Sequence, residues 1–253
     1  MNWRVVAASA IGSSHVASGG VCEDSCWATV DTQFDGGSFL AIFVSDGAGS
    51  ASRGAEGAKL AVQAAEGFVD TRVKQDEFGL NSALAFKLID VVRDCVYAKA
   101  EAEGLKARDY ACTFIGVLSS SCGTLVFQIG DGGVVIDVGA GLEVPVVPMS
   151  GEYANMTHFV TDEDAGSRLA TKVYNDPALR VAVFSDGLQR LALNMAANTP
   201  HEPFFAPFFK VLQQALPEQE DQLHTALVRF LGSQAVNERT DDDKTLALAV
   251  KIP

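Results

Sequence analysis

The sequence predicts an α+β protein built in layers, because its expected strands come in groups and do not alternate regularly with helices. Seven apolar segments have the length and composition of strands, and they cover residues 3–8, 38–44, 113–118, 124–129, 134–138, 180–184 and 245–252. Two long helical patterns, over residues 51–73 and 81–103, follow the second strand, and two further helices are expected after Pro203 and Pro217. A doubly wound parallel sheet needs a helix between most successive strands, so this order favours a different fold class.

The expected helices have the apolar spacing of helices with one buried face. In the segment 81–103 either Asn81 or Ser82 provides the N-cap, and the buried face consists of Leu84, Leu88, Val91, Cys95 and Ala98. The helix after Pro217 has a similar stripe of Leu223, Leu227 and either Phe230 or Leu231.

The composition is that of one globular domain. The chain has 253 residues, of which 48% are apolar, and this is enough for a single large core. No stretch has the composition of a linker or a repeat, so one domain over residues 1–253 is expected. A polar, irregular segment at 148–176, which contains Asp162, Glu163 and Asp164, is predicted to form a flap over one end of the sheets.

The net charge argues against two classes of binding partner, and the cysteines indicate the cellular compartment. The formal net charge of −13 argues against binding to nucleic acid or to an anionic membrane surface. No segment resembles a secretory signal or a membrane span, and five scattered cysteines fit the reduced thiols of a cytoplasmic protein. Cys22 and Cys26 do not predict a zinc site, because no second Cys or His pair completes four ligands.

An Asp-Gly dipeptide follows an apolar strand three times, at Asp46, Asp131 and Asp186. An Asp in this place lies at the edge of a sheet, and the Gly after it leaves its own carbonyl oxygen accessible to a cation. Asp-Gly is also a favoured turn dipeptide, and around Asp131 a simple hairpin explains the sequence equally well. Asp46 and Asp186 precede helical patterns, so either could instead be a helix N-cap.

Further carboxylates lie next to expected strands near both ends of the chain. Glu23 and Asp24 lie between a Gly-containing turn and an expected strand, and Asp241, Asp242 and Asp243 immediately precede the last strand. Each group alone is typical of a solvated loop. If these groups meet in the fold, they repel one another unless bound cations lie between them.

Carboxylate and carbonyl oxygens without convergent His or Cys select Mg²⁺ or Mn²⁺. Calcium is less favoured, because no segment has the spacing of an EF-hand loop. The phosphate-binding P-loop, the dinucleotide-binding Gly motif and the GxSxG motif are all absent from the sequence. The sequence therefore favours metal-dependent chemistry over a serine or cysteine nucleophile.

Taken together, the acidic motifs resemble those of the metal-dependent protein phosphatase family of type 2C. The resemblance rests on motifs that occur in the family's order, namely Glu23 and Asp24, Ser45 to Gly49, Gly130 and Asp131, Ser185 to Gly187, and Asp242 to Thr245. These motifs span residues 15–245, and they are similar in particular to those of small, stand-alone bacterial members. The resemblance implies a four-layer α-β-β-α sandwich of two antiparallel sheets flanked by helix pairs, with a metal cleft at one end.

The resemblance also implies a function, the hydrolysis of phosphoserine and phosphothreonine in proteins by direct attack of a water or hydroxide that bridges two Mn²⁺ or Mg²⁺ ions. In this scheme Asp46 bridges the ions and Gly47 adds its carbonyl oxygen. Asp186 and Asp242 complete the ligands of one ion, and Glu23 binds the other. Asp131 and Asp186 hold a third, weaker ion. Asp24 orients the attacking water, so Asp24, Asp46 and Asp186 are the expected catalytic residues.

Two departures from the family pattern concern the substrate. Many relatives carry a basic phosphate-binding residue where this chain has Gly19, and a His where it has Ala48. His15 and Arg53 are the candidates for substrate binding, although a hydrogen-bonded structural His and an exposed helix charge explain them as well. A catalytically weak regulatory or scaffold module of the same fold is therefore the alternative function, and a nuclease is disfavoured by the charge.

Overall fold

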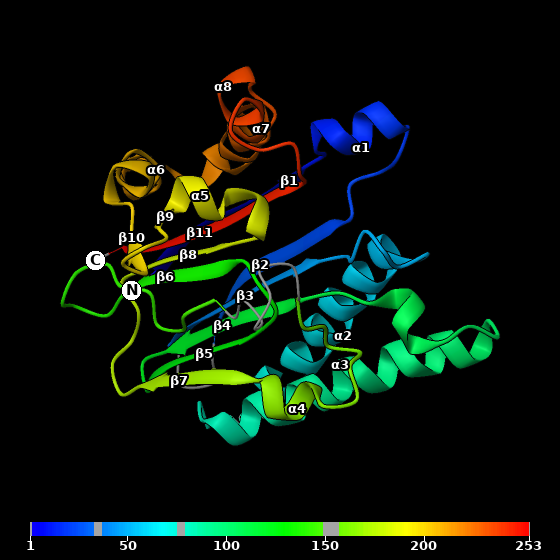
Figure 1. The fold of residues 1–253 in the computed structure, drawn as a ribbon. Helices are drawn as coiled ribbons and strands as arrows, with labels where there is room; N and C mark the ends of the chain where they lie inside the picture. The colour runs from blue at the N-terminus through cyan, green and yellow to red at the C-terminus, as the bar shows by residue number, and fades with distance from the viewer. Residues whose placement is uncertain (1, 33–36, 75–78, 149–156, 253) are drawn as a thin grey trace.

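Two antiparallel sheets form the centre of the computed structural model, which describes residues 2–32, 37–74, 79–148 and 157–252 (Figure 1). The four-stranded sheet has the order β1 (Asn2–Ala10), β11 (Lys244–Ile252), β8 (Arg180–Phe184) and β6 (Gly133–Asp137). The five-stranded sheet has the order β2 (Asp24–Thr32), β3 (Ser38–Asp46), β4 (Phe114–Ser120), β5 (Gly123–Ile129) and β7 (Ala170–Tyr174). All pairings within the two sheets are antiparallel, and each strand predicted from the sequence is confirmed.

A pair of long helices covers the outer face of each sheet. The helices α2 (Gly54–Lys74) and α3 (Ser82–Ala102) pack on the five-stranded sheet, and α6 (Glu202–Gln214) and α7 (Glu220–Leu231) pack on the four-stranded sheet (Figure 1). This arrangement confirms the predicted four-layer sandwich. No helix in the described residues combines the length and the apolar character that crossing a bilayer requires.

Short elements form the connections between these layers. They are α1 (Ser13–Ser18), η1 (Ala107–Tyr110), α4 (Ala165–Arg168), η2 (Asp186–Leu188), α5 (Gln189–Ala192), η3 (Pro217–Gln219), α8 (Gln234–Asn237) and the two-residue strands β9 (Leu193–Asn194) and β10 (Thr199–Pro200). In Figure 1, α1 lies at one end of the sandwich, and the two chain ends lie together at the other.

Both faces of β3 are buried, which explains its uninterrupted apolar sequence. Phe39, Ala41 and Phe43 contact the helices α2 and α3. Leu40 and Ile42 point to the other side, into the core between the two sheets. Because side chains alternate between the faces of a strand, a central strand with two buried faces needs an apolar residue at every position.

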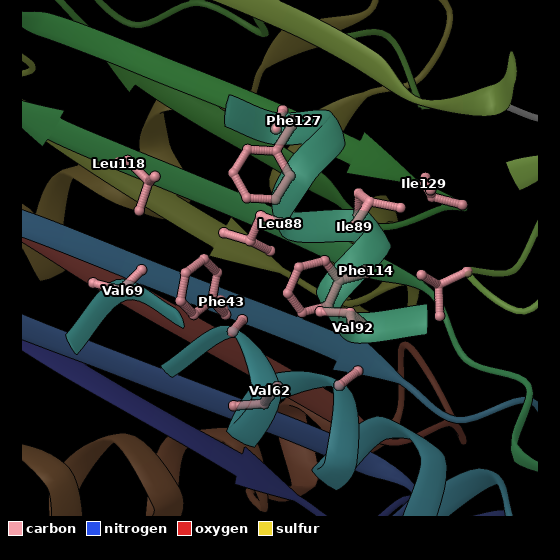
Figure 2. Packing of buried hydrophobic residues seen from close by; sticks show 14 of the residues in the cluster. Phe43, Val62, Val69, Leu88, Ile89, Val92, Phe114, Leu118, Phe127 and Ile129 are labelled. Atoms are coloured by element: carbon pink, nitrogen blue, oxygen red, sulfur yellow. The ribbon is translucent and has the colours of Figure 1, made fainter. Parts of the chain in front are cut away.

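Aromatic rings fill the core between the five-stranded sheet and its helices. Phe43, Phe114 and Phe127 lie with ring centroids 5.6 to 6.3 Å apart, within the range of favourable aromatic pairs. Figure 2 shows these rings beneath α3, close to Leu88 and Val92. All of these side chains are inaccessible to solvent, so this core fixes α2 and α3 relative to the strands.

The structure confirms the start of the α3 prediction and corrects its second half. The side chain of Asn81 accepts a hydrogen bond from the Leu84 N–H at 3.1 Å, as an N-cap does. Leu84 and Leu88 are buried as predicted, but Val91, Cys95 and Ala98 are not, and the residues buried in their place are Val92, Val96 and Ala100. The buried stripe follows steps of four residues along the helix, whereas the predicted step from 88 to 91 turns away from the sheet.

The prediction for the last long helix is confirmed. In α7, Leu227 and Leu231 are buried, and Leu223 and Phe230 pack against the same core while remaining partly exposed. The helix therefore covers β1 with one apolar face, and α6 covers β11.

The segment predicted as a flap is described in part, because residues 149–156 lie outside the described ones. Its end differs from the prediction, since residues 170–174 form β7, which pairs with β5 at the edge of the five-stranded sheet. No residue of β7 is buried, so this strand lacks the apolar run by which the others were recognised. Before it, Arg93 of α3 donates hydrogen bonds to the carbonyl oxygens of Val160 and Asp162.

Candidate metal centre and active site

A cleft of about 430 Å³ opens where the ends of strands from both sheets meet. In the five-stranded sheet, Glu23 precedes β2 and Asp46 ends β3, which is the antiparallel neighbour of β2. In the four-stranded sheet, Asp186 follows β8 and Asp242 precedes the neighbouring β11. The fold brings seven of the predicted site residues into the lining of this cleft: His15, Glu23, Asp46, Gly47, Asp131, Asp186 and Asp242.

Asp46 is held at the cleft by contacts with the start of β4. Its backbone N–H donates to Thr113 Oγ1 at 3.0 Å, and its carbonyl oxygen accepts from the Thr113 N–H at 2.8 Å. The neighbouring Ser45 Oγ donates to the Thr113 carbonyl oxygen at 2.6 Å. The N-cap alternative for Asp46 is wrong, because α2 begins only at Gly54.

Gly47 lies where the chain leaves β3 and passes under the first turn of α2. A Cβ at this position would lie 2.4 Å from the carbonyl carbon of Gly54 and 2.5 Å from its oxygen. Any larger residue would therefore force the end of β3 and the start of α2 apart. The close approach of the two backbones explains why glycine follows Asp46 here.

Asp186 and Asp242 meet because β8 and β11 are adjacent. Asp186 is the first residue of η2, whose N-cap is Ser185, so the N-cap alternative for Asp186 is also wrong. A Cβ at Gly187 would lie 2.0 Å from the carbonyl oxygen of Asp243, so only glycine allows η2 to lie this close to the segment before β11.

Asp131 lies where the chain crosses from one sheet to the other. β5 belongs to the five-stranded sheet and β6 to the four-stranded sheet, so the alternative of a simple hairpin around Asp131 is wrong. Gly130 and Gly132 flank it with φ values of 95° and 91°, which favour glycine. Thr157 Oγ1 donates to Asp131 Oδ2 at 2.7 Å. The crossing therefore places this carboxylate in the cleft, opposite strand ends of both sheets.

Asp24 lies beneath the cleft, opposite Asp46 in the register of β2 and β3. Its Oδ2 accepts hydrogen bonds from Ser185 Oγ and Thr245 Oγ1, both at 2.7 Å. Burial raises the pKa of Asp24 to about 7, while the two hydroxyl groups lower it and the charges of Asp243 and Asp186 raise it further.

The carboxylates of the cleft destabilise one another's charges. Burial, followed by the charges of Asp24 and Asp186, raises the pKa of Asp46 well above its ordinary value. Burial and the charge of Asp131 raise the pKa of Asp186 to about 6. Burial also raises the pKa of Glu23. The charge of Asp186 thus opposes the ionisation of Asp46, and a cation bound between the two groups would relieve this repulsion.

The oxygen atoms of the cleft fit hydrated divalent ions. Glu23 Oε2, Asp24 Oδ1 and Asp186 Oδ1 are buried and have no hydrogen-bond partner. Such atoms are costly unless a ligand binds them. Across the described ranges, no three His, Cys, Asp or Glu side chains converge as the ready-made cage of one ion. The unpartnered carboxylate oxygens are the kind of ligand that Mg²⁺ and Mn²⁺ prefer.

His15 reaches the cleft from α1. Its Nδ1 lies 2.9 Å from Asp243 Oδ2, and no Lys or Arg lies beside it in the lining formed by the described residues. Partial burial lowers the pKa of His15, but the hydrogen bond and charge of Asp243, together with Glu23 and Asp242, raise it above the ordinary value. His15 is therefore both hydrogen-bonded and placed in the cleft.

Arg53 is not brought to this site. Its side chain is exposed, and it is not part of the cleft lining. Its charge contributes to lowering the pKa of Glu103, at the end of α3, after the larger effects of Lys99 and Tyr110. Arg53 is therefore an exposed charge, as the alternative interpretation has it, although it lies in the turn just before α2 and not within the helix.

Sequence reasoning missed Thr113 and Thr157, whose hydroxyl groups hold the carboxylates, because isolated Thr residues carry no spacing signal. Ser185 was named as part of a motif, but its hydrogen bond to Asp24 was not predicted. Asp243 was named in the acidic run and in the closing motif of Asp242 to Thr245, but no role was predicted for it.

Comparison with known proteins agrees with the geometry of the cleft. The family model described as Protein phosphatase 2C matches residues 11–232. The chain is 54% identical over 250 residues to Serine/threonine-protein phosphatase 3 of Escherichia coli (strain K12). The aligned residues cover 99% of each of the two chains.

Solved structures of low sequence identity share the fold. The catalytic domain of the serine threonine protein phosphatase PstP, in complex with 2 manganese ions, has a TM-score of 0.60 and 17% identity over 99% of both chains. The S. agalactiae serine/threonine phosphatase has a TM-score of 0.61 and 16% identity over 100% of both chains. The family match and the identity to the E. coli protein, together with the shared fold, establish that this chain belongs to the protein phosphatase 2C family.

Proposed function

We propose that this protein is a metal-dependent serine/threonine protein phosphatase, which hydrolyses phosphomonoesters on phosphorylated proteins. The observation that carries the proposal is the convergence of Glu23, Asp46, Asp131, Asp186 and Asp242 in one cleft, with buried carboxylate oxygens that have no protein partner. The printed name of the 54% identical relative supports the same activity.

The residues that would hold two Mn²⁺ or Mg²⁺ ions are Glu23, Asp46, the carbonyl of Gly47, Asp186 and Asp242, and Asp131 with Asp186 would hold a weaker third ion. When bound, such ions neutralise the carboxylates, lower the pKa of water and stabilise negative charge on the phosphoryl group. The manganese in the PstP complex supports this choice of metal.

The chain's own residues position the reactants. Ser185 and Thr245 hold one carboxylate oxygen of Asp24, so we assign the other oxygen, which has no protein partner, as the acceptor for a water in the cleft. Asp46 and Asp186 lie in the lining of the cleft, where the ions that they would hold would bind the phosphoryl group. His15 is the candidate for direct contact with the phosphate, because it is the basic side chain of the described lining.

The alternative is a catalytically weak regulatory or scaffold module, which is motivated by Ala48 in the cleft and by the lack of an arginine in its described lining. We favour the active enzyme, because a module that no longer catalyses has no need to keep the unpartnered carboxylates of the cleft, which are costly to bury.

Hydrolysis of p-nitrophenyl phosphate with added Mn²⁺ distinguishes the two functions. The active enzyme is expected to turn over, and both EDTA and Asp46→Asn are expected to abolish the activity. Asp90→Asn makes the same chemical change on an exposed face of α3 and should have no effect. No turnover of p-nitrophenyl phosphate over a wide range of pH and metal concentration would favour the regulatory or scaffold module. A second assay compares DNA with phosphopeptides as substrates, and hydrolysis of DNA alone would favour a nuclease.

A further inference from the structure

The helix α1 is held in place by polar contacts and not by apolar packing. None of its residues is buried, and Val16 is 60% exposed. The Ser14 N–H and the Ser14 hydroxyl both donate to the carbonyl oxygen of Asp241, at 2.9 and 2.7 Å. The position of α1 over the cleft therefore depends on the segment that precedes β11.

Asp243 is the centre of these contacts. Its side chain is 2% exposed, and its carboxylate accepts hydrogen bonds from the Gly12 N–H and the Glu23 N–H, both at 2.5 Å, and from His15 Nδ1 at 2.9 Å. The three donors lie before, within and after α1. These three hydrogen bonds stabilise the buried charge of Asp243, and the nearby charge of Lys244 adds to this effect.

The hydrogen bond to Asp243 also determines which nitrogen of His15 is free. A carboxylate accepts a proton from Nδ1–H, so Nε2 is the ring nitrogen left for another partner. The hydrogen bonds of the described residues leave Nε2 without a protein partner, and the side chain is 24% exposed and lines the cleft. Nε2 also carries a hydrogen when His15 is the imidazolium cation, and in this form it can donate to an oxygen of a substrate phosphate in the cleft.

We propose that Asp243 is a positioning residue of the phosphatase reaction, which directs His15 Nε2 to the substrate phosphate and fixes the backbone at Glu23. This inference rests on the proposed function, because it assigns Asp243 two separate effects on that reaction. Through His15, Asp243 affects the binding of phosphate. Through Glu23, it affects the binding of the metal.

The first test compares Asp243→Asn with Asp241→Asn. The two variants remove the same charge from the two positions that flank Asp242, but only the carboxylate of Asp243 accepts hydrogen bonds from Gly12, His15 and Glu23. We expect D243N to weaken Mn²⁺ binding in calorimetry by about tenfold to a hundredfold and to lower kcat/KM by a similar factor, as supporting residues of metal sites do. D241N is expected to change both quantities much less. Equal effects of the two variants on both quantities would overturn the proposal.

The second test separates the two effects with His15→Asn. Asn places an amide N–H near the position of Nδ1, so it keeps the contact with Asp243 but lacks Nε2. We expect H15N to raise KM and the inhibition constant of inorganic phosphate by about tenfold or more, with a smaller change in kcat and unchanged Mn²⁺ affinity. In D243N/H15N the loss of kcat/KM should be smaller than the product of the single losses. Independent, multiplicative losses contradict the coupling.

A third measurement does not require the variants to fold or the enzyme to turn over. Imidazole ¹H–¹⁵N spectra of the Mg²⁺-loaded wild-type protein should show Nδ1 of His15 protonated, and on binding of inorganic phosphate Nε2 should also be protonated and its resonance should shift. The absence of a phosphate-induced shift would overturn the proposed contact between His15 and phosphate, whatever the Mn²⁺ affinity and kcat/KM of D243N are. Absence of turnover by the wild-type protein would instead refute the proposed function, and the Mn²⁺ titration and these spectra would still decide the role of Asp243.

Discussion

Replacing Gly47 by Ala tests whether the backbone contact behind Asp46 sets the geometry of the cleft. The added Cβ would lie 2.4 Å from the carbonyl carbon of Gly54, and ordinary contacts begin at 3.4 Å, so the two backbones must move apart by about 1 Å. Overpacking of this kind costs about 1 to 3 kcal/mol of unfolding free energy. A displacement of about 1 Å at a catalytic group lowers activity by about a hundredfold.

The two expectations are measured separately. Urea denaturation followed by circular dichroism gives the loss of stability, and kcat/KM for p-nitrophenyl phosphate with saturating Mn²⁺ gives the loss of activity. Gly49→Ala is the control for stability, because its Cβ would meet only Glu23 Oε2 at 3.8 Å. Wild-type stability and activity in G47A would refute the reasoning, since the contact would then have no structural or catalytic consequence.

Three further predictions concern stability and are measured by chemical denaturation. Phe127→Ala should cost about 3 to 5 kcal/mol, because the ring is buried among other aromatic rings; a loss below about 1 kcal/mol would contradict this packing. Asn81→Ala should cost about 1 kcal/mol through loss of the N-cap of α3, and an unchanged midpoint would mean that the cap contributes nothing. Burial alone would raise the pKa of Asp137, but the hydrogen bond from Arg180 and two backbone N–H groups lower it. Its stabilisation is therefore complete above its unfolded pKa of about 3.9 and is lost as the pH falls through the lower folded pKa. Asp137→Asn should thus be less stable than wild type at neutral pH and lose less stability on acidification, and parallel pH profiles for the two proteins would disprove this role.

Most strands were predictable because a buried strand needs apolar residues, and these residues appear as an apolar run in the sequence. In β3 every position between Phe39 and Val44 faces one of two cores, and no polar residue interrupts the run. β7 lacks an apolar run, because it lies at an edge of the sheet and none of its residues is buried. The face of α3 was misassigned beyond Leu88, since several spacings of apolar residues are compatible with a helix and only the contact with the sheet selects one.

The members of the site could be listed from the sequence, but their mutual arrangement could not be derived from the residues alone. Asp46 and Asp186 were recognisable because each ends an apolar strand, which is a local feature. The crossing at Asp131 depends on which sheet β6 joins, and a short apolar segment does not encode that choice. Asp243 binds donors that are more than 200 residues away in sequence, so its importance emerges only when β1 and β11 pair.

The carboxylates of the cleft are divided between the two sheets. Glu23 and Asp46 adjoin strands of the five-stranded sheet, Asp186 and Asp242 adjoin strands of the four-stranded sheet, and Asp131 lies on the crossing between the two. Ions bound between them would therefore link the two halves of the sandwich, and occupancy would be coupled to the cooperativity of unfolding. At a free ion concentration of about 100 times Kd, this linkage adds about 2.7 kcal/mol to the folded state. Resistance to heat and to proteolysis would then depend on the supply of divalent ions in the surroundings of the protein.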